Sequence, residues 1–152
     1  MKRKIIIILS TLLIVSACNY KPIYNSPELK NINYKFIEEK GDSQINKIII
    51  KNLRQNNVKK DGAKIIEIKL NSQFNKTVLA KDKFGSATDY KLSITSTFEV
   101  DNNDESLTFI ISEDFVYKNL QENYEQSNYE SSIKKNLAEQ ISEKLRTKLL
   151  TY

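Results

Sequence analysis

Histidine is absent from this sequence, and cysteine occurs only once among its 152 residues. These absences exclude an intramolecular disulfide, a zinc site of cysteine and histidine, a histidine-ligated haem, and nucleophilic catalysis by a Ser-His-Asp or Cys-His pair. Hydrophobic residues make up only 39% of the chain, but eight tyrosines and six phenylalanines argue against disorder. The length suits one domain with a core of its own.

The first residues have the composition of an export signal. Three basic residues within the first four positions precede an almost unbroken apolar run from Ile5 to Val15. A membrane-spanning helix needs about 20 apolar residues, so this run is too short to span a bilayer comfortably. A basic start, a short apolar centre and an end of small residues predict a secretory signal peptide over residues 1–17.

The end of that signal resembles the lipobox of bacterial lipoproteins. Val15-Ser16-Ala17-Cys18 combines an aliphatic residue, two small residues and the sole cysteine of the chain. The resemblance implies cleavage before Cys18 and acylation of its thiol and new amine, by chains such as palmitate, and two or more chains anchor a protein stably. An ordinary signal or membrane anchor with a chance cysteine is the alternative. Asn19, rather than the aspartate of inner-membrane retention, favours the outer membrane.

The charge of the chain changes when the signal is removed. The whole sequence carries 24 basic and 19 acidic residues, a net charge of +5 that invites a nucleic-acid or anionic-lipid partner. Three of the basic residues, and none of the acidic ones, fall within residues 1–17. The remainder has 21 basic and 19 acidic side chains, so we expect no nucleic-acid partner.

The remaining chain divides into a tether and a domain. Residues 18–31 contain both prolines, Pro22 and Pro27, which favour an extended conformation. This segment is therefore predicted to be a lipidated, semi-rigid tether. Residues 32–152 are predicted to form the folded domain.

Hydrophobic alternation predicts four strands in the domain. Apolar residues recur at every second position over residues 31–39, 66–75, 90–100 and 107–117. Turns are predicted at residues 81–85 and 101–105, which are rich in Asp, Asn or Gly.

Two helices are predicted from apolar residues spaced three or four apart. The first follows the cap Gly41-Asp42-Ser43 and ends near residues 55–57. The second is expected to begin at a capping box, Ser127 with Glu130, and to run for about 20 residues to Leu149. An i,i+4 pair between Glu130 and Lys134 is expected to support it.

These elements predict an α+β fold, a two-layer sandwich. A mostly antiparallel four-stranded sheet is expected to bury one face under both helices. The other face should be exposed, with polar side chains that include Lys69, Lys91, Thr95 and Thr97.

The sequence also resembles a known family at several points. Residues 18–24, Cys-Asn-Tyr-Lys-Pro-Ile-Tyr, are similar to the start of the LPS-assembly lipoproteins, the LptE family, in its alphaproteobacterial form. Asn19 departs from the usual glycine. The turn Lys83-Phe84-Gly85 and the helical segment 137–145 fit the same family, as does the element order.

The resemblance implies a role in assembly, with no catalysis and no cofactor. Members of the family plug a large outer-membrane β-barrel, LptD, help it to assemble, and bind lipopolysaccharide. The implied localisation is the outer membrane, held by the lipid on Cys18, with the domain at the periplasmic side or in the barrel lumen. Lys81, Lys83 and Lys91 are then the candidate contacts for lipid phosphates. Phe84 stands where many relatives have a polar residue, and ordinary solvated lysines remain the alternative interpretation.

Two other classes of function are alternatives to this one. A generic outer-membrane lipoprotein that binds another envelope component would need a cleft motif, and the sequence offers none that is convincing. An enzyme would need paired catalytic groups, but Glu113 and Asp114 are strand neighbours that should face opposite ways.

Overall fold

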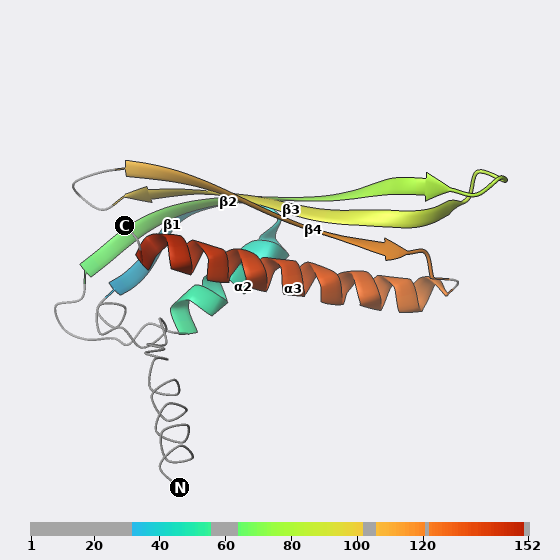
Figure 1. Ribbon diagram of the computed structural model, residues 1–152. Helices are drawn as coiled ribbons and strands as arrows, with labels where there is room; N and C mark the ends of the chain where they lie inside the picture. The colour runs from blue at the N-terminus through green and yellow to red at the C-terminus, as the bar shows by residue number, and fades with distance from the viewer. Residues whose placement is uncertain (1–31, 56–63, 102–105, 121, 151–152) are drawn as a thin grey trace, which may run out of the picture.

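The domain is a sheet with two helices on one of its faces (Figure 1). A computed structural model describes residues 32–55, 64–101, 106–120 and 122–150. The predicted signal, Cys18, the tether and the turn after residue 101 lie outside these residues. The element order is β1 (Ile32–Gly41), α2 (Ser43–Gln55), β2 (Lys64–Lys81), β3 (Ala87–Asp101), β4 (Ser106–Lys118) and α3 (Asn123–Leu150).

The sheet follows the chain order β1-β2-β3-β4 and is mixed. β1 and β2 run parallel, with Ile32 opposite Lys64, because α2 carries the chain back to the end where β1 began. β2, β3 and β4 are antiparallel to one another, which confirms the predicted α+β fold with a mostly antiparallel sheet.

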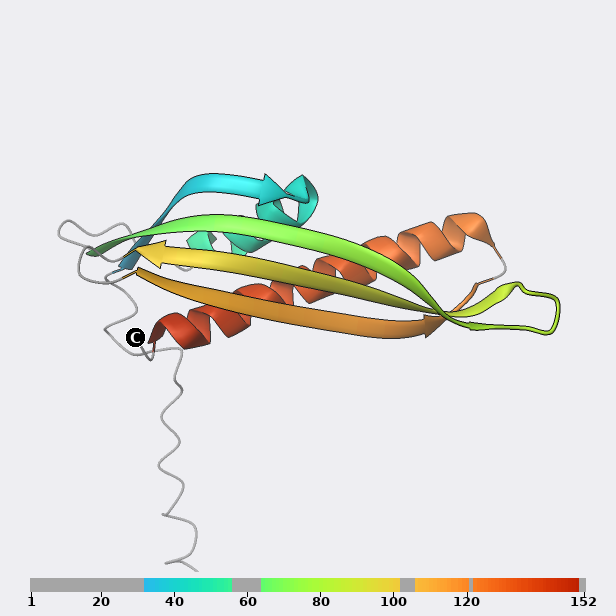
Figure 2. The same ribbon diagram turned by 90° about the horizontal axis from the view of Figure 1, so that it is seen from above.

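The long β2–β3 hairpin gives the molecule two distinct ends (Figure 2). At the base end, β1 and β2 begin and α3 finishes. At the tip end, the turn of residues 82–86 projects past the start of α3. β2 has 18 residues and is longer than predicted, because its last residues, 76–81, continue the ladder without apolar alternation.

α2 begins where the sequence predicts. The carboxylate of Asp42 accepts hydrogen bonds from the amides of Gln44 at 3.0 Å and Ile45 at 3.1 Å, as an N-cap does. Ile45 and Leu53 are fully buried on the inner side of the helix. Glycine is required at position 41, just before this cap, because the backbone there lies close to β2. A Cβ on Gly41 would lie 1.9 Å from the carbonyl oxygen of Ser72.

α3 begins four residues earlier than predicted and has 28 residues. The expected capping box is wrong: Glu130 does not reach back to Ser127 but bonds Lys76 on β2 and Tyr117 on β4. The expected pair of Glu130 with Lys134 is also wrong, because Lys134 binds Asp42 at 2.7 Å. Tertiary partners outcompete the local ones in both cases.

The core lies between the sheet and the helices and is mostly aliphatic. Its largest fully buried side chain is Phe98, on β3. Ser72 and Ser96 interrupt the apolar face of the sheet, and their hydroxyls satisfy each other at 2.7 Å. The other core members come from every element; they include Ile45, Ile49, Leu53, Ile68, Leu70, Leu92, Ile94, Val100, Ile141 and Leu145.

Candidate functional site

The turn at the tip of the hairpin is ordered by one side chain. The carboxylate of Asp82 accepts hydrogen bonds from the amides of Phe84 at 2.8 Å and Ser86 at 2.9 Å. Its backbone carbonyl accepts the Gly85 amide at 3.1 Å, and Gly85 has φ of 85°. The carboxylate of Asp82 therefore bonds the backbone of its own turn.

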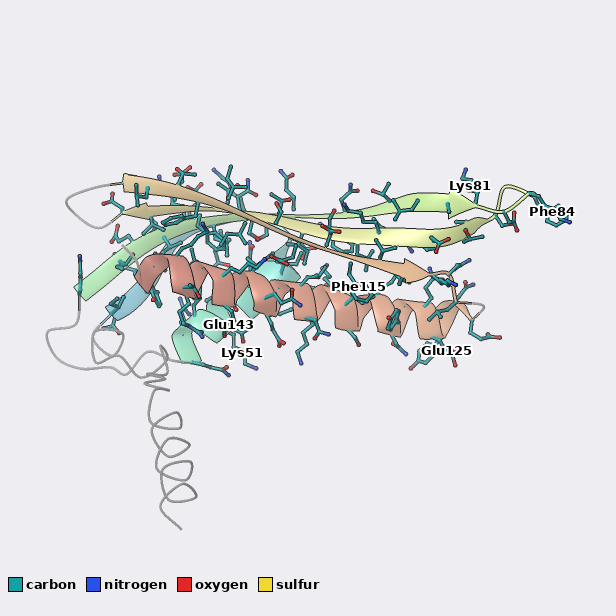
Figure 3. The ribbon with its side chains drawn as sticks, in the orientation of Figure 1. Lys51, Lys81, Phe84, Phe115, Glu125 and Glu143 are labelled. Atoms are coloured by element: carbon teal, nitrogen blue, oxygen red, sulfur yellow. The ribbon has the colours of Figure 1, made fainter. Side chains whose placement is uncertain are left out.

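Two of the three predicted lysines lie together at this tip. Lys81 ends β2 and lies on the side of the hairpin away from the helices, and Lys83 lies within the turn (Figure 3). Phe84 is 81% exposed, and the Lys83 ammonium lies 4.9 Å from the centre of its ring. The tip thus presents an exposed aromatic ring beside the Lys83 cation, with Lys81 at the end of the adjoining strand.

Lys91 does not belong to the same group. It lies four residues into β3 from Ala87, which places it roughly 13 Å along the strand. Its ammonium is 3.5 Å from the carboxylate of Asp114 on the neighbouring strand. The structure therefore brings Lys81 and Lys83 together and leaves Lys91 as a partly neutralised charge on the outer face.

Exposed apolar residues gather at the tip end, which sequence reasoning missed. Val78 and Leu79 lie on the hairpin stem, beside irregularities in the β2–β3 pairing at residues 78–81. Phe115 and Val116 lie near the end of β4, and Tyr124 lies in the first turn of α3. The signal in the sequence was the apolar run Val78-Leu79-Ala80, which breaks the alternation of the strand.

At the same end of the domain, an aromatic and ionic cluster joins the hairpin to α3. Tyr117 stacks on Tyr90 at 5.6 Å and meets Tyr129 edge-on at 5.7 Å. The Tyr117 hydroxyl donates to the Glu130 carboxylate, which also pairs with Lys76 at 2.6 Å. The Lys76 ammonium lies 4.3 Å from the ring centre of Tyr90.

The electrostatics of the cluster follow from these contacts. Burial alone would raise the pKa of Glu130, but hydrogen bonds from Lys76, Tyr117 and Gln126 outweigh burial and hold that pKa below its usual value. Burial and the neighbouring Glu130 carboxylate raise the pKa of Tyr117 well above its usual value. At neutral pH the tyrosine is therefore a neutral donor to an ionised acceptor.

The outer face of the sheet is polar, and its charges pair across strands. Lys35 binds Glu67 at 2.6 Å, and Lys69 binds Glu99 at 3.1 Å. Hydroxyls also meet there, with Thr95 and Ser112 at 3.0 Å. This face can therefore offer hydrogen bonds to a polar surface without a large net charge.

The two adjacent carboxylates of β4 do not form a pair. Glu113 lies on the helix-facing side of β4, paired with Lys144, whereas Asp114 lies on the outer side with Lys91, so the two carboxylates face opposite ways. Among residues 32–55, 64–101, 106–120 and 122–150, no group of three metal-binding side chains is present. Within the same ranges, no helix is long and apolar enough to cross a membrane.

Comparison with known families decides the identity. The sequence profile of LptE, described as lipopolysaccharide-assembly, matches residues 29–149. The chain belongs to the LptE family. It is accordingly a lipoprotein with a role in lipopolysaccharide assembly, in a non-enzymatic family. No curated protein sequence matches this LptE-family chain.

Solved structures share the fold of this LptE-family chain. The rare lipoprotein B of Shewanella oneidensis has a TM-score of 0.61 at 17% identity, over 78% of this chain and 95% of the other. A putative lipoprotein from Caulobacter crescentus has a TM-score of 0.52 at 14% identity, over 82% and 91%. An uncharacterized lipoprotein B from Nitrosomonas europaea has a TM-score of 0.52 at 11% identity, over 79% and 84%.

Proposed function

We propose that this chain is an outer-membrane lipoprotein that plugs an LptD-type β-barrel, helps the barrel to assemble, and assists the insertion of lipopolysaccharide at the cell surface. Membership of the LptE family supports the proposal most directly. Cys18 carries the lipid anchor, at the periplasmic side. The partners are the barrel, lipopolysaccharide and the outer membrane.

The outer face of the sheet suits contact with the barrel interior. A barrel lumen is polar, so a plug needs a surface that can hydrogen-bond without burying unpaired charge. The cross-strand pairs of Lys35 with Glu67 and of Lys69 with Glu99 meet this need. Threonine, serine and asparagine side chains supply the remaining donors and acceptors.

The hairpin tip suits contact with lipopolysaccharide. The lipid carries phosphates beside acyl chains, and the tip likewise combines the cations Lys81 and Lys83 with the exposed ring of Phe84. Lysine binds phosphate as a point charge, and the ring can cover apolar surface. Lys91 is a secondary contact, because Asp114 already lies 3.5 Å from it.

Co-purification tests the barrel partnership. The lipidated chain, extracted from membranes in mild detergent, should recover a protein of barrel size. A free monomer from cells in which the barrel assembles correctly without this chain would contradict the proposal, and recovery with a different envelope component would favour the generic lipoprotein.

Crosslinking from the tip tests the site. A photoreactive residue at positions 81–85 should capture barrel or lipid, and Lys81→Gln with Lys83→Gln should weaken binding to lipopolysaccharide. Lys35→Gln with Lys40→Gln is the matched control, since it removes the same charge from ion-paired lysines. Equal losses in both double variants, or no crosslink from the tip, would refute the site while leaving the family membership intact.

A further inference from the structure

The solvent-facing side of α2 carries three cations and no acid. Lys47, Lys51 and Arg54 are exposed and are spaced four and three residues apart, and the sequence of α2 contains no Asp or Glu. This spacing places them on one side of the helix, in a strip about 10 Å long. In Figure 3, Lys51 points away from the sheet.

These cations differ from the lysines of the sheet because they are not neutralised. Within the described part of the chain, no ion pair joins Lys47, Lys51 or Arg54 to a carboxylate. Arg54 lies 5.7 Å from the ring centre of Phe36. The three cations line one open depression together with Glu39, which forms no ion pair with them. The strip is therefore a local excess of positive charge.

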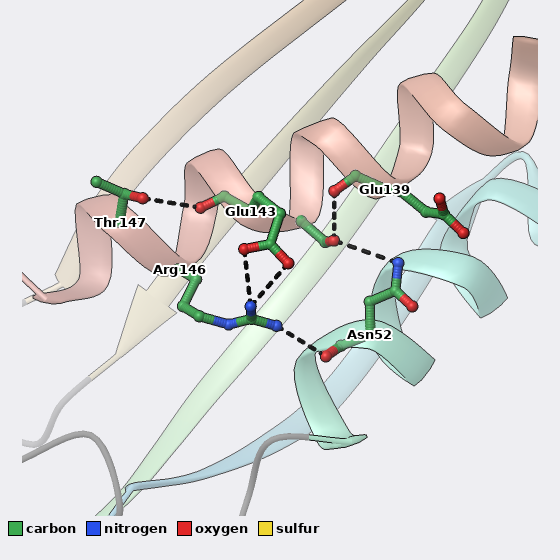
Figure 4. Close-up of polar contacts among 6 residues, drawn as sticks. Asn52, Glu139, Glu143, Arg146 and Thr147 are labelled. Carbon is green, nitrogen blue, oxygen red and sulfur yellow. Dashed lines mark hydrogen bonds and ion pairs between the residues drawn. The ribbon is translucent and has the colours of Figure 1, made fainter. Parts of the chain in front are cut away.

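The strip is held in place by α3. The Arg146 guanidinium donates to the backbone carbonyl of Asn52 at 2.9 Å, at the end of α2 (Figure 4). Its other amino group donates to both carboxylate oxygens of Glu143, each at 2.8 Å. The Asn52 amide also donates to the hydroxyl of Ser142 at 3.4 Å. These contacts fix the cationic side of α2 relative to the domain.

We propose that this side of α2 binds the anionic phospholipid headgroups of the bilayer to which the chain is tethered. α2 finishes toward the base end, where β1 begins at Ile32 and the chain enters the domain. Cys18 lies 14 residues before Ile32, so the lipid anchor reaches at most about 50 Å from that point. The strip is thus within reach of the bilayer surface.

The shape and chemistry of the strip favour a membrane over a protein partner. Lys51 and Arg54 border an open depression of about 580 Å³ rather than an enclosed pocket, which suits a field of phosphates. Protein interfaces are anchored by large apolar or aromatic side chains. Among the described residues, the exposed large apolar side chains lie elsewhere, and none is on α2. Polybasic surfaces beside an acyl anchor act as a second membrane-binding signal.

Vesicle binding tests the proposal without the lipid anchor. The core consists of residues between Tyr34 and Leu149, so the exported chain with Cys18→Ser keeps its packing. It should sediment with phosphatidylcholine vesicles that contain phosphatidylglycerol and not with phosphatidylcholine alone. Combining Lys47→Gln, Lys51→Gln and Arg54→Gln should reduce that binding about a hundredfold, from about fivefold per cation.

The control removes the same charge from ion-paired lysines. Lys35→Gln, Lys40→Gln and Lys69→Gln together lower the net charge equally, at residues already paired with carboxylates. The vesicle binding of this control variant should fall by less than about tenfold, because its lysines are already paired with carboxylates and add little to the positive potential of the surface. Equal losses in both variants, or unchanged binding in the α2 variant, would each overturn the proposal.

A second measurement uses the full lipidated chain. Its single native cysteine is the expected acylation site, so an introduced cysteine is the only free thiol. A charged thiol reagent should label Gln55→Cys, at the end of α2, more slowly in vesicles with phosphatidylglycerol than without. Thr77→Cys, on β2 of the hairpin, should label equally in both, and equal rates for Gln55→Cys would contradict the proposal. The inference is independent of the barrel partnership, which these assays do not include.

Discussion

The base half and the tip half of this domain share one sheet and one long helix, but different chemistry packs them. At the base, both helices cover the sheet, and the contacts are aliphatic, with Ile49, Leu53 and Leu145 fully buried. At the tip only α3 crosses the hairpin, and the contacts are tyrosine rings and a shared carboxylate, Glu130. The base is therefore packed as a hydrophobic core. The tip is held to α3 by the cluster of Lys76, Tyr90, Tyr117, Tyr129 and Glu130, which we call the clasp.

This difference implies that the base governs the stability of the domain, whereas the tip carries the surface proposed for interaction. Apolar burial supplies most of the folding free energy, so the base should govern global unfolding. The clasp depends on a few hydrogen bonds, and segments with few buried apolar contacts open at lower cost. Exposed apolar residues lie at that same tip end, together with Lys81 and Lys83, the cations of the proposed lipopolysaccharide site.

The largest effect is expected at the base. Phe98→Ala should lower the free energy of unfolding by about 3–5 kcal/mol, because it leaves a cavity in the core. Phe84→Ala removes the same ring from the exposed tip and should stay within about 0.5 kcal/mol. Urea unfolding of the two variants measures both, and similar losses would break the comparison.

A smaller effect is expected at the clasp. Tyr117→Phe removes the hydroxyl that donates to the Glu130 carboxylate, and should cost about 1.5–3 kcal/mol, as hydrogen bonds to charged groups do. Hydrogen exchange should quicken in the last residues of β4 and the first turns of α3, with base amides unchanged. Tyr129→Phe is the control, because Tyr129 contacts Tyr117 through its ring. Uniform quickening over the whole domain would show one cooperative unit instead.

Acid should weaken the contacts that α3 makes with the rest of the domain. Hydrogen bonds outweigh burial and hold the pKa of both Glu130 and Asp42 below their usual values. The unfolded chain therefore binds more protons in this window, so stability is present above about pH 4 and falls as pH drops through the folded pKa values. Acid titration of the unfolding free energy should show this loss, and Glu130→Gln should make it shallower. An unchanged slope would mean that Glu130 carries none of the dependence.

The smallest effect is expected on the outer face. Lys69→Gln breaks an ion pair with Glu99 that is about half exposed, so it should leave the free energy of unfolding almost unchanged because solvent screens the pair. Chemical denaturation at low and high salt measures it. A loss as large as that of Tyr117→Phe would mean that the outer face is not merely a neutralised surface.

Local patterns predicted much of the fold. Period-two alternation located the strands, and the apolar stripe of α2 with the cap at Asp42 located its start. The second helix was predicted too short because the residues from Ser127 to Glu130 match a capping box, which would start the helix there. In the structure α3 begins at Asn123, and Glu130 bonds side chains of β2 and β4 instead. Lys76 lies 54 residues before Glu130 in the chain, and no local pattern reports that the two meet.

The candidate site was predicted only in part. The turn of Lys81 and Lys83 was expected from its composition, and the structure places both at the tip. Lys91 was grouped with them, but strand register sets it beside Asp114 instead. The sequence marks Phe84 only as a departure from the family, whereas the structure exposes its ring beside the Lys83 ammonium, at the tip that carries both lysines.

The sequence by itself predicted an export signal, and it determined the position of the sole cysteine, the fold class and which face of each element is apolar. These follow from composition and periodicity, which are local properties of a chain. Only the tertiary structure decided which charges are neutralised. A charge acts strongly over a few ångströms, and strand register supplies carboxylates to Lys35 and Lys69 but none to Lys47, Lys51 or Arg54 among the described residues.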